Sequence, residues 1–269
     1  MKERTADLMA DEAARAEMAA HEFDHDFLRT HLADERRKAS LLGEVREAIF
    51  GAQDGLVSTL AVVSIVAGAS GDRFAVLVAG IASALGGLFS MAAGEYLSSK
   101  SQREIFEAQI VDERREVHER PGEAEAEIAF LLEADGLPRN KASGVAGMLA
   151  EHPDVLLKTM VEKELGLAIQ PGEGSPLQGA MVMGAAFGLG SLVPVLPHLI
   201  LPIGPSVYVS VAATLLVLFG IGVVKSRWTH RGWFSSGLEI MIVGAVAGVA
   251  GYFFGNVFPG LLGAPEAAA

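Results

Sequence analysis

Long apolar stretches alternate with charged stretches along this chain, and their lengths give the first indication of the fold. A hydrocarbon core of about 30 Å requires roughly 20 residues of helix. Five apolar stretches of that order are bounded by charged or turn residues; they cover residues 48–69, 74–97, 177–199, 206–224 and 234–258. The pattern therefore predicts an all-α integral membrane protein with five transmembrane helices.

The charged residues divide the chain into regions. We expect a charged N-terminal helix at 1–44, spans one and two at 45–98, an acidic helical domain at 99–175, spans three to five at 176–260, and a tail at 261–269. No helix breaker lies between Gly94 and Pro121, so span two should continue beyond the membrane as one rod. Breaks near 136–138 and 152–153 predict two or three shorter helices after it.

Basic residues near the ends of the spans predict the orientation, because cytoplasmic flanks are enriched in Lys and Arg. They precede span one, follow span two and join spans four and five; the other flanks hold Arg73, an uncharged turn at 194–205 and a tail without Lys or Arg. We expect the N-terminus and the acidic domain in the cytoplasm, the C-terminus outside, and a bacterial inner membrane as the location. The absence of cysteine excludes disulfides and thiolate metal sites, and the net charge of −12 argues against nucleic acid as a partner.

One carboxylate lies where lipid would surround it. Asp54 falls inside span one, where an ionised carboxylate costs at least about 2.5 kcal/mol. A helix start at the headgroup level, or a neutral carboxylic acid, would explain it without function. The neighbouring polar side chains Gln53, Ser58 and Thr59 favour a cation or proton site on a water-accessible path.

The end of span two carries two further candidate ligands. Met91 and Glu95 are four residues apart and share one helix face. Counted from the cytoplasmic ends of antiparallel spans, Asp54 and Met91 lie at similar depths, and Glu95 lies about one turn nearer the cytoplasm. A carboxylate with a thioether suits a transition-metal ion better than Mg²⁺ or Ca²⁺, although a lone Met in a span ordinarily only packs.

The acidic domain carries ligand-type residues at helical spacing. Each of three expected helices presents a pair three or four residues apart: Glu113 with Glu116, Glu123 with Glu127, and Met160 with Glu164. Such pairs on facing helices would form a cation cage. Ordinary solvated acidic helices explain the same spacing equally well.

The N-terminal segment contains a His-Glu-x-x-His pattern, with His21, Glu22 and His25. In zinc proteases this pattern supplies two metal ligands and a base. A zinc protease also requires a third ligand in a folded catalytic domain, and the charged N-terminal segment offers only some forty residues. We expect a helix on the membrane surface and no enzyme, with His31 adding at most a minor role in attracting metal.

Four segments together resemble the vacuolar iron transporter family from about Glu44 onward. They read GAQDGLVS at 51–58, SMAAGEY at 90–96, SQRE at 101–104 and EKELGL at 162–167. The resemblance implies a homodimer with a pore between the subunits and proton-coupled transfer of Fe²⁺ out of the cytosol. It also implies a transport site at Asp54 and Met91 and a metal-collecting site in the cytoplasm; this site would use Glu113, Glu116, Glu127, Met160 and Glu164.

The chain departs from the family pattern at two positions. Ser83 stands where some plant members carry a second carboxylate, so Glu95 is a candidate substitute. Ala124 stands at another expected carboxylate, with Glu123 beside it. The function predicted is an Fe²⁺ exporter without a resident cofactor. A Mn²⁺ or broader exporter, including Zn²⁺ or Co²⁺, a membrane metal sensor, and a metalloenzyme built on His21 and His25 are the alternatives.

Overall fold

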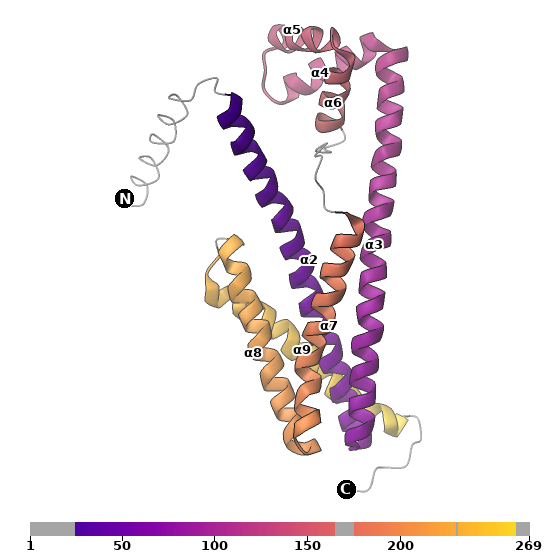
Figure 1. The fold of residues 1–269 in the computed structure, drawn as a ribbon, viewed down its shortest axis with the longest axis vertical. Helices are drawn as coiled ribbons and strands as arrows, with labels where there is room; N and C mark the ends of the chain where they lie inside the picture. The colour runs from indigo at the N-terminus through magenta and orange to yellow at the C-terminus, as the bar shows by residue number, and fades with distance from the viewer. Residues whose placement is uncertain (1–24, 165–174, 230, 262–269) are drawn as a thin grey trace, which may run out of the picture. The chain divides into compact units, whose positions relative to one another are not determined.

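Helices account for most of the chain that the structure describes. A computed structural model describes residues 25–164, 175–229 and 231–261. Within these ranges the elements are α2 (His25–Ser70), α3 (Arg73–Glu119), α4 (Pro121–Ala134), α5 (Arg139–Ala150), α6 (Pro153–Lys163), α7 (Pro176–Ile200), α8 (Ile203–Thr229) and α9 (Trp233–Leu261). Five of them, α2, α3, α7, α8 and α9, are long and apolar enough to cross a membrane (Figure 1). The predicted all-α membrane fold is confirmed.

The chain divides into two compact units, residues 1–46 and residues 47–269. The second unit contains the apolar part of α2 and every later helix. The boundary between the charged N-terminal helix and span one was expected at residue 44, and α2 runs through this boundary without a break, from His25 to Ser70. Gly43 is the only candidate breaker nearby, and a single glycine costs a helix only about 1 kcal/mol.

The rod and the three short helices form as the sequence predicts. The 47 residues of α3 correspond to about 70 Å of helix, far more than the hydrocarbon core, so α3 continues well beyond the membrane. Helices α4, α5 and α6 begin after the predicted breaks and pack with the end of α3 around a common core. We call this assembly, residues 110–164, the acidic insert.

Helix α7 matches the span expected at 177–199, and the turn expected at 194–205 is shorter than predicted. Pro194 and Pro197 lie inside α7, and the helix continues to Ile200. The Oγ of Ser210 on α8 donates a hydrogen bond to the carbonyl of Pro194 over 2.7 Å. Each proline removes one backbone donor from the helix, a loss that membrane helices tolerate when they are buried against other helices.

The hairpin between α2 and α3 is closed by local hydrogen bonds. Gly71 adopts φ +61°, a left-handed conformation that suits glycine at the end of a helix. The carboxylate of Asp72 accepts hydrogen bonds from the backbone N–H groups of Phe74 and Ala75 and so caps α3. The guanidinium of Arg73 donates to the carbonyls of His198 and Leu199, which fixes the hairpin against the end of α7.

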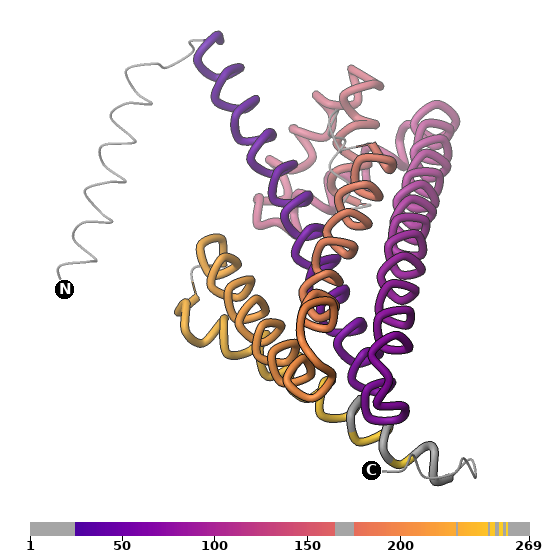
Figure 2. The backbone as a smooth tube through the Cα atoms, turned by 60° about the horizontal axis from the view of Figure 1, so that its bottom comes forward, coloured from indigo at the N-terminus to yellow at the C-terminus, as the bar shows by residue number. Residues whose placement is uncertain are grey.

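Helix α7 packs between the hairpin helices. Figure 2 shows α3 running beside α7, in agreement with the many contacts between them. Glycines at four-residue spacing make close approach possible inside the chain: Gly184 and Gly188 of α7 face Ala92 and Leu88 of α3. This pair therefore serves packing within one chain, which is one of the two roles that such spacing allows.

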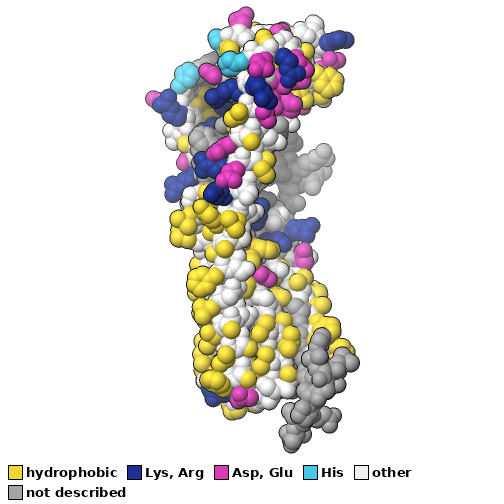
Figure 3. Space-filling view, turned by 90° about the vertical axis from the view of Figure 1, so that its right-hand side faces the viewer, with side chains coloured by type: hydrophobic (Ala, Val, Ile, Leu, Met, Phe, Trp, Pro, Cys, Tyr) yellow, Lys and Arg dark blue, Asp and Glu magenta, His cyan; other side chains and the backbone are white. Residues whose placement is uncertain are grey.

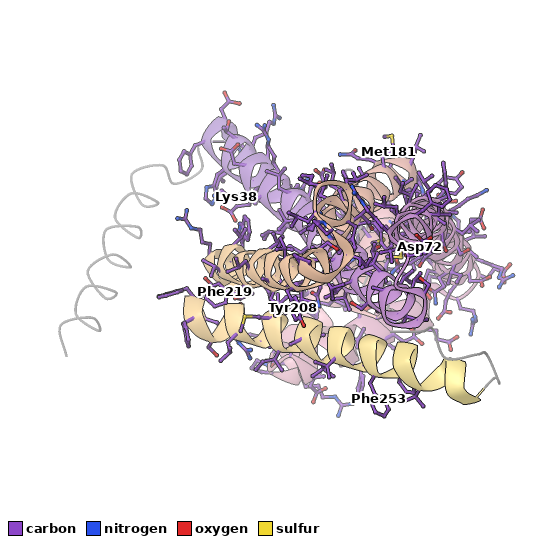
Figure 4. All side chains as sticks on the ribbon, turned by 90° about the horizontal axis from the view of Figure 1, so that it is seen from below. Lys38, Asp72, Met181, Tyr208, Phe219 and Phe253 are labelled. Carbon is purple, nitrogen blue, oxygen red and sulfur yellow. The ribbon has the colours of Figure 1, made fainter. Side chains whose placement is uncertain are left out.

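Helices α8 and α9 lie beside one another and complete the bundle. Figure 4 labels Phe219 on α8, which stacks edge-on against Trp233 and Phe234 at the start of α9. Leu218 of α8 is fully buried in a cluster with Leu56 of α2 and Ile240 of α9.

The surface separates by polarity. Large apolar side chains are exposed along the spans, and Lys, Arg, Asp and Glu gather over the acidic insert (Figure 3). Exposed apolar side chains on the spans are what lipid contact requires.

Close packing of α2 on α7 leads to a stability prediction. A Cβ at Gly55 would lie 2.2 Å from the carbonyl oxygen of Phe187, whereas a Cβ at Gly220 would meet nothing within 4 Å. We expect Gly55→Ala to lower the apparent melting temperature in detergent clearly, because backbone must move at a cost of roughly 1–3 kcal/mol. The matched substitution Gly220→Ala should change it little. Equal melting temperatures for the two variants would refute this packing.

Candidate metal sites

Contacts with α7 place Asp54 and Met91 at nearly the same level of the bundle. Asp54 precedes Gly55, which packs on Phe187, and Met91 precedes Ala92, which packs on Gly184. Positions 184 and 187 are one turn apart, so the two side chains originate within about one turn, roughly 5 Å, of each other along the axis. Both side chains are half-buried. The similar depths expected from the sequence therefore agree with the packing.

A pair of hydroxyl groups lies deeper between α2 and α3. The Oγ1 of buried Thr59 and the Oγ of Ser83 are 3.5 Å apart. Glu95 is twelve residues further along the same helix, about 18 Å away along its axis. Glu95 therefore cannot occupy the place of a carboxylate at Ser83. Its Oε1 accepts a hydrogen bond of 2.6 Å from Ser99, so any role for Glu95 belongs nearer the acidic insert.

One acidic residue of α2, two helical turns before Asp54, was not identified from the sequence as a candidate. Glu47 lies seven residues before Asp54, and its carboxylate lies against Gly179 of α7. The spacing of seven, which is two helical turns, was the available signal.

The hydrophobic core of the acidic insert determines which of its ligand-type residues face outward. Met160 is fully buried among apolar residues that include Val117, Ile128 and Leu156. Ala124 is also fully buried in this core, whereas Glu123 beside it is exposed. Packing accounts for the burial of Met160, and its role as a ligand stays a prediction.

Three carboxylates converge where α3 meets α4. Glu116, Glu123 and Glu127 each offer an oxygen, and these oxygens lie within 4.8 Å of one another. We call these three residues the carboxylate cluster. Glu123 and Glu127 also line a shallow depression with Glu164, Phe130 and Leu131. A group of oxygen ligands at this spacing can hold a divalent cation.

Two carboxyl groups of this region have raised pKa values because they are partly buried and lie near other carboxylates. Burial, and then Glu116 and Glu164, raise the pKa of Glu127 from 4.5 to about 7. Burial, and then Glu164 and Glu116, also raise the pKa of Glu113. The buried Oε2 of Glu113 has no hydrogen-bond partner within the described part of the chain. The insert thus brings together Glu113, Glu116, Glu123, Glu127 and Glu164, five of its six candidate residues.

The cation of this region was not predicted from the sequence. The guanidinium of Arg120 pairs with Glu116 over 3.1 Å and with Glu123 over 2.6 Å. Its spacing, four residues after Glu116 and three before Glu123, was a usable signal for helical ion pairs.

Other expectations fall outside the described residues. His21 and Glu22 of the His-Glu-x-x-His pattern lie there, as do the end of the EKELGL segment and the tail from 262 onward. His25 and His31 are on α2, and the ring of His31 stacks on Phe27.

The raised pKa of Glu127 predicts competition between protons and metal. Because an ion must displace the proton, affinity for Mn²⁺ should rise about tenfold per pH unit below about pH 6.5 and level off above about pH 7.5. The raised pKa also means that the stabilisation from this group is complete below about pH 4.5 and is lost as pH rises through about 7. Mn²⁺ titrations of the full chain across this pH range measure how affinity depends on pH. The pH dependence of affinity should flatten in Glu127→Gln. An equally steep pH dependence in that variant would mean that Glu127 is not the group that competes with metal.

The fold and these residues define a class: a multi-pass helical membrane protein with a half-buried carboxylate inside its spans and an acidic cluster outside them. The sequence model of the VIT family matches residues 45–256. Vacuolar iron transporter 1 of Eucalyptus grandis is 33% identical over 224 residues, which cover 82% of this chain and 90% of the relative. Vacuolar iron transporter 1 of Arabidopsis thaliana is 33% identical over 79% of this chain and 85% of its own. Protein CCC1 of Saccharomyces cerevisiae is 28% identical over a match that covers 78% of this chain and 67% of the relative. The chain belongs to the VIT family.

Proposed function

We propose that this protein exports Fe²⁺ from the cytosol in exchange for protons. The observation that carries the proposal is that a carboxylate, Asp54, and a thioether, Met91, lie at nearly the same level of a spanning bundle. A thioether beside a carboxylate favours a transition-metal ion over Mg²⁺ or Ca²⁺. Relatives that carry the name vacuolar iron transporter support iron as the substrate.

The proposal gives the acidic insert the task of collecting the ion. Several carboxylates gather there outside the membrane, and the orphaned oxygen of Glu113 and the protonation of Glu127 near pH 7 are properties of a site that exchanges protons for metal. Glu113, Glu116, Glu123, Glu127 and Glu164 are the proposed ligands. Met160 would join them only if the core around it opened. Glu95 would lie between this site and Asp54.

Proton exchange supplies the driving force. Moving a divalent ion outward against an inside-negative potential of 100 mV costs about 4.6 kcal/mol, twice the cost for one charge. Protons that enter in return offset this cost. The carboxyl groups of the path can release a proton when they take up metal, because metal binding favours their ionised form.

The proposal includes an orientation and an assembly. The basic flanks favour an orientation with the acidic insert in the cytosol and the C-terminus on the opposite side. The resemblance to the family implies a homodimer with the pore between subunits. The relatives are named for the vacuole, which gives no support to the expected bacterial inner membrane.

Two other functions are candidates, and one experiment distinguishes them from Fe²⁺ export. The same ligand set suits Mn²⁺, so an Mn²⁺ exporter is the second candidate. A metal sensor would use the insert without transport. Fe²⁺ and Mn²⁺ uptake into proteoliposomes with an imposed proton gradient separates all three: flux of one ion identifies the substrate, and binding without flux of either ion would leave the sensor.

A further inference from the structure

Arg120 is the single residue between α3 and α4. Its backbone N–H donates to the carbonyl of Glu116 over 2.8 Å, and its own carbonyl accepts hydrogen bonds from the N–H groups of Glu123 and Ala124. Pro121 follows it as the first residue of α4. Backbone bonds on both sides therefore fix where the side chain of Arg120 begins, at the corner where the two acidic helices meet.

The side chain of Arg120 spans this corner. Its Nη2 lies 3.1 Å from Oε2 of Glu116, and its Nη1 lies 2.6 Å from Oε2 of Glu123. Glu127, the third member of the carboxylate cluster, acts on the guanidinium at longer range. One positive charge thus contacts two of the three carboxylates and interacts electrostatically with the third.

We propose that Arg120 is the resident counter-ion of the carboxylate cluster and that an incoming divalent ion displaces it. This inference rests on the proposed role of the cluster in collecting metal. The three carboxylates repel one another when no metal ion is bound to the cluster, and the guanidinium offsets that repulsion. A metal ion that takes the same oxygens must break both ion pairs and tolerate a neighbouring positive charge. Arg120 therefore lowers the affinity of the cluster and favours release of the ion toward the membrane.

The expected effect is moderate because the guanidinium is 56% exposed. Exposed ion pairs contribute little individually, and water screens them. We expect removal of Arg120 to tighten metal binding by about threefold to tenfold, with a smaller gain at high salt. A purely structural link between α3 and α4 would behave differently, because its removal would lower the melting temperature and leave metal affinity equal or weaker.

The test measures Mn²⁺ affinity of the purified full chain by calorimetry, with melting temperatures recorded for every variant. Arg120→Gln should bind Mn²⁺ about threefold to tenfold more tightly than the parent, and Arg120→Lys should stay close to the parent because the charge is kept. The matched control is Arg115→Gln, because the guanidinium of Arg115 pairs with Asp112 over 2.7 Å, outside the carboxylate cluster. It should change affinity less than twofold. Unchanged or weaker binding in a folded Arg120→Gln would overturn the inference, as would equal tightening in Arg115→Gln. If Arg120→Gln does not fold, clearly tighter binding by Arg120→Lys overturns the inference and parental affinity supports it.

The same titration separates this inference from the function beneath it. If Glu116→Gln and Glu127→Gln leave Mn²⁺ binding intact, the carboxylate cluster is not the collecting site and both ideas fail. If these variants weaken binding and Arg120→Gln does not tighten it, only the counter-ion role of Arg120 is wrong.

Discussion

Asp54→Asn is expected to reduce metal flux into proteoliposomes to the level of vesicles without protein. The amide keeps the size of the side chain and removes its negative charge. Asp54 lies half-buried in the spanning part of α2, where an unused carboxylate would be costly. A neutral amide is a weaker ligand for a divalent ion and cannot exchange a proton, so both functions proposed for this position are lost. Flux is measured with a metal-sensitive dye inside the vesicles.

Asp72→Asn is the matched control for this prediction. Asp72 caps α3 at the hairpin, labelled in Figure 4, by accepting hydrogen bonds from Phe74 and Ala75. Asparagine caps helices about as well as aspartate, so this variant should keep nearly parental flux and stability. If Asp54→Asn retained half of the parental flux or more, the carboxylate of Asp54 would not be part of the transport site.

The double substitution Glu116→Gln/Glu127→Gln is expected to weaken Mn²⁺ binding by the full chain about a hundredfold. Each glutamine removes one charged oxygen ligand from the carboxylate cluster, and ligand charge is a main determinant of affinity for such ions. Proton release on binding should also fall, because Glu127 has a pKa of about 7 and carries a proton in much of the metal-free protein at neutral pH. Calorimetry in two buffers of different ionisation enthalpy measures both quantities.

The matched control for the cluster is Glu104→Gln/Glu107→Gln. These residues lie earlier on α3, and both are exposed beside Lys100 and Arg103. The control removes the same charge from the same helix and should lower affinity less than threefold. Comparable losses in the two double variants would mean that binding follows overall charge, and the cluster would then not be a specific site.

The sequence predicted the fold well because the lipid imposes the pattern. Span lengths, the rod of α3 and the breaks before α5 and α6 all follow from runs of apolar residues and from Gly and Pro positions. The turn expected at 194–205 was set too wide, because Pro194 and Pro197 lie inside α7. The local sequence does not reveal whether contacts with other helices hold a helix together through a proline.

The candidate metal residues were predictable as types and spacings but not as an arrangement. Helical spacing identified Glu116, Glu123 and Glu127, which do converge. Helical spacing also predicted that Met160 and Glu164 act together, although Met160 is fully buried in the hydrophobic core. Packing between helices decides between these outcomes. Arg120 is not a metal ligand, so ligand types and spacings did not identify it as the cation that balances the cluster.

Metal ions should cross the membrane in exchange for protons. Internal metal and internal pH are recorded together in proteoliposomes that contain the parent protein, hold an imposed inside-acidic proton gradient and receive external Fe²⁺. Fe²⁺ should enter as protons leave, and collapsing the gradient with an ionophore should slow Fe²⁺ entry. Fe²⁺ entry that is unaffected by the ionophore and produces no change of internal pH would contradict the account.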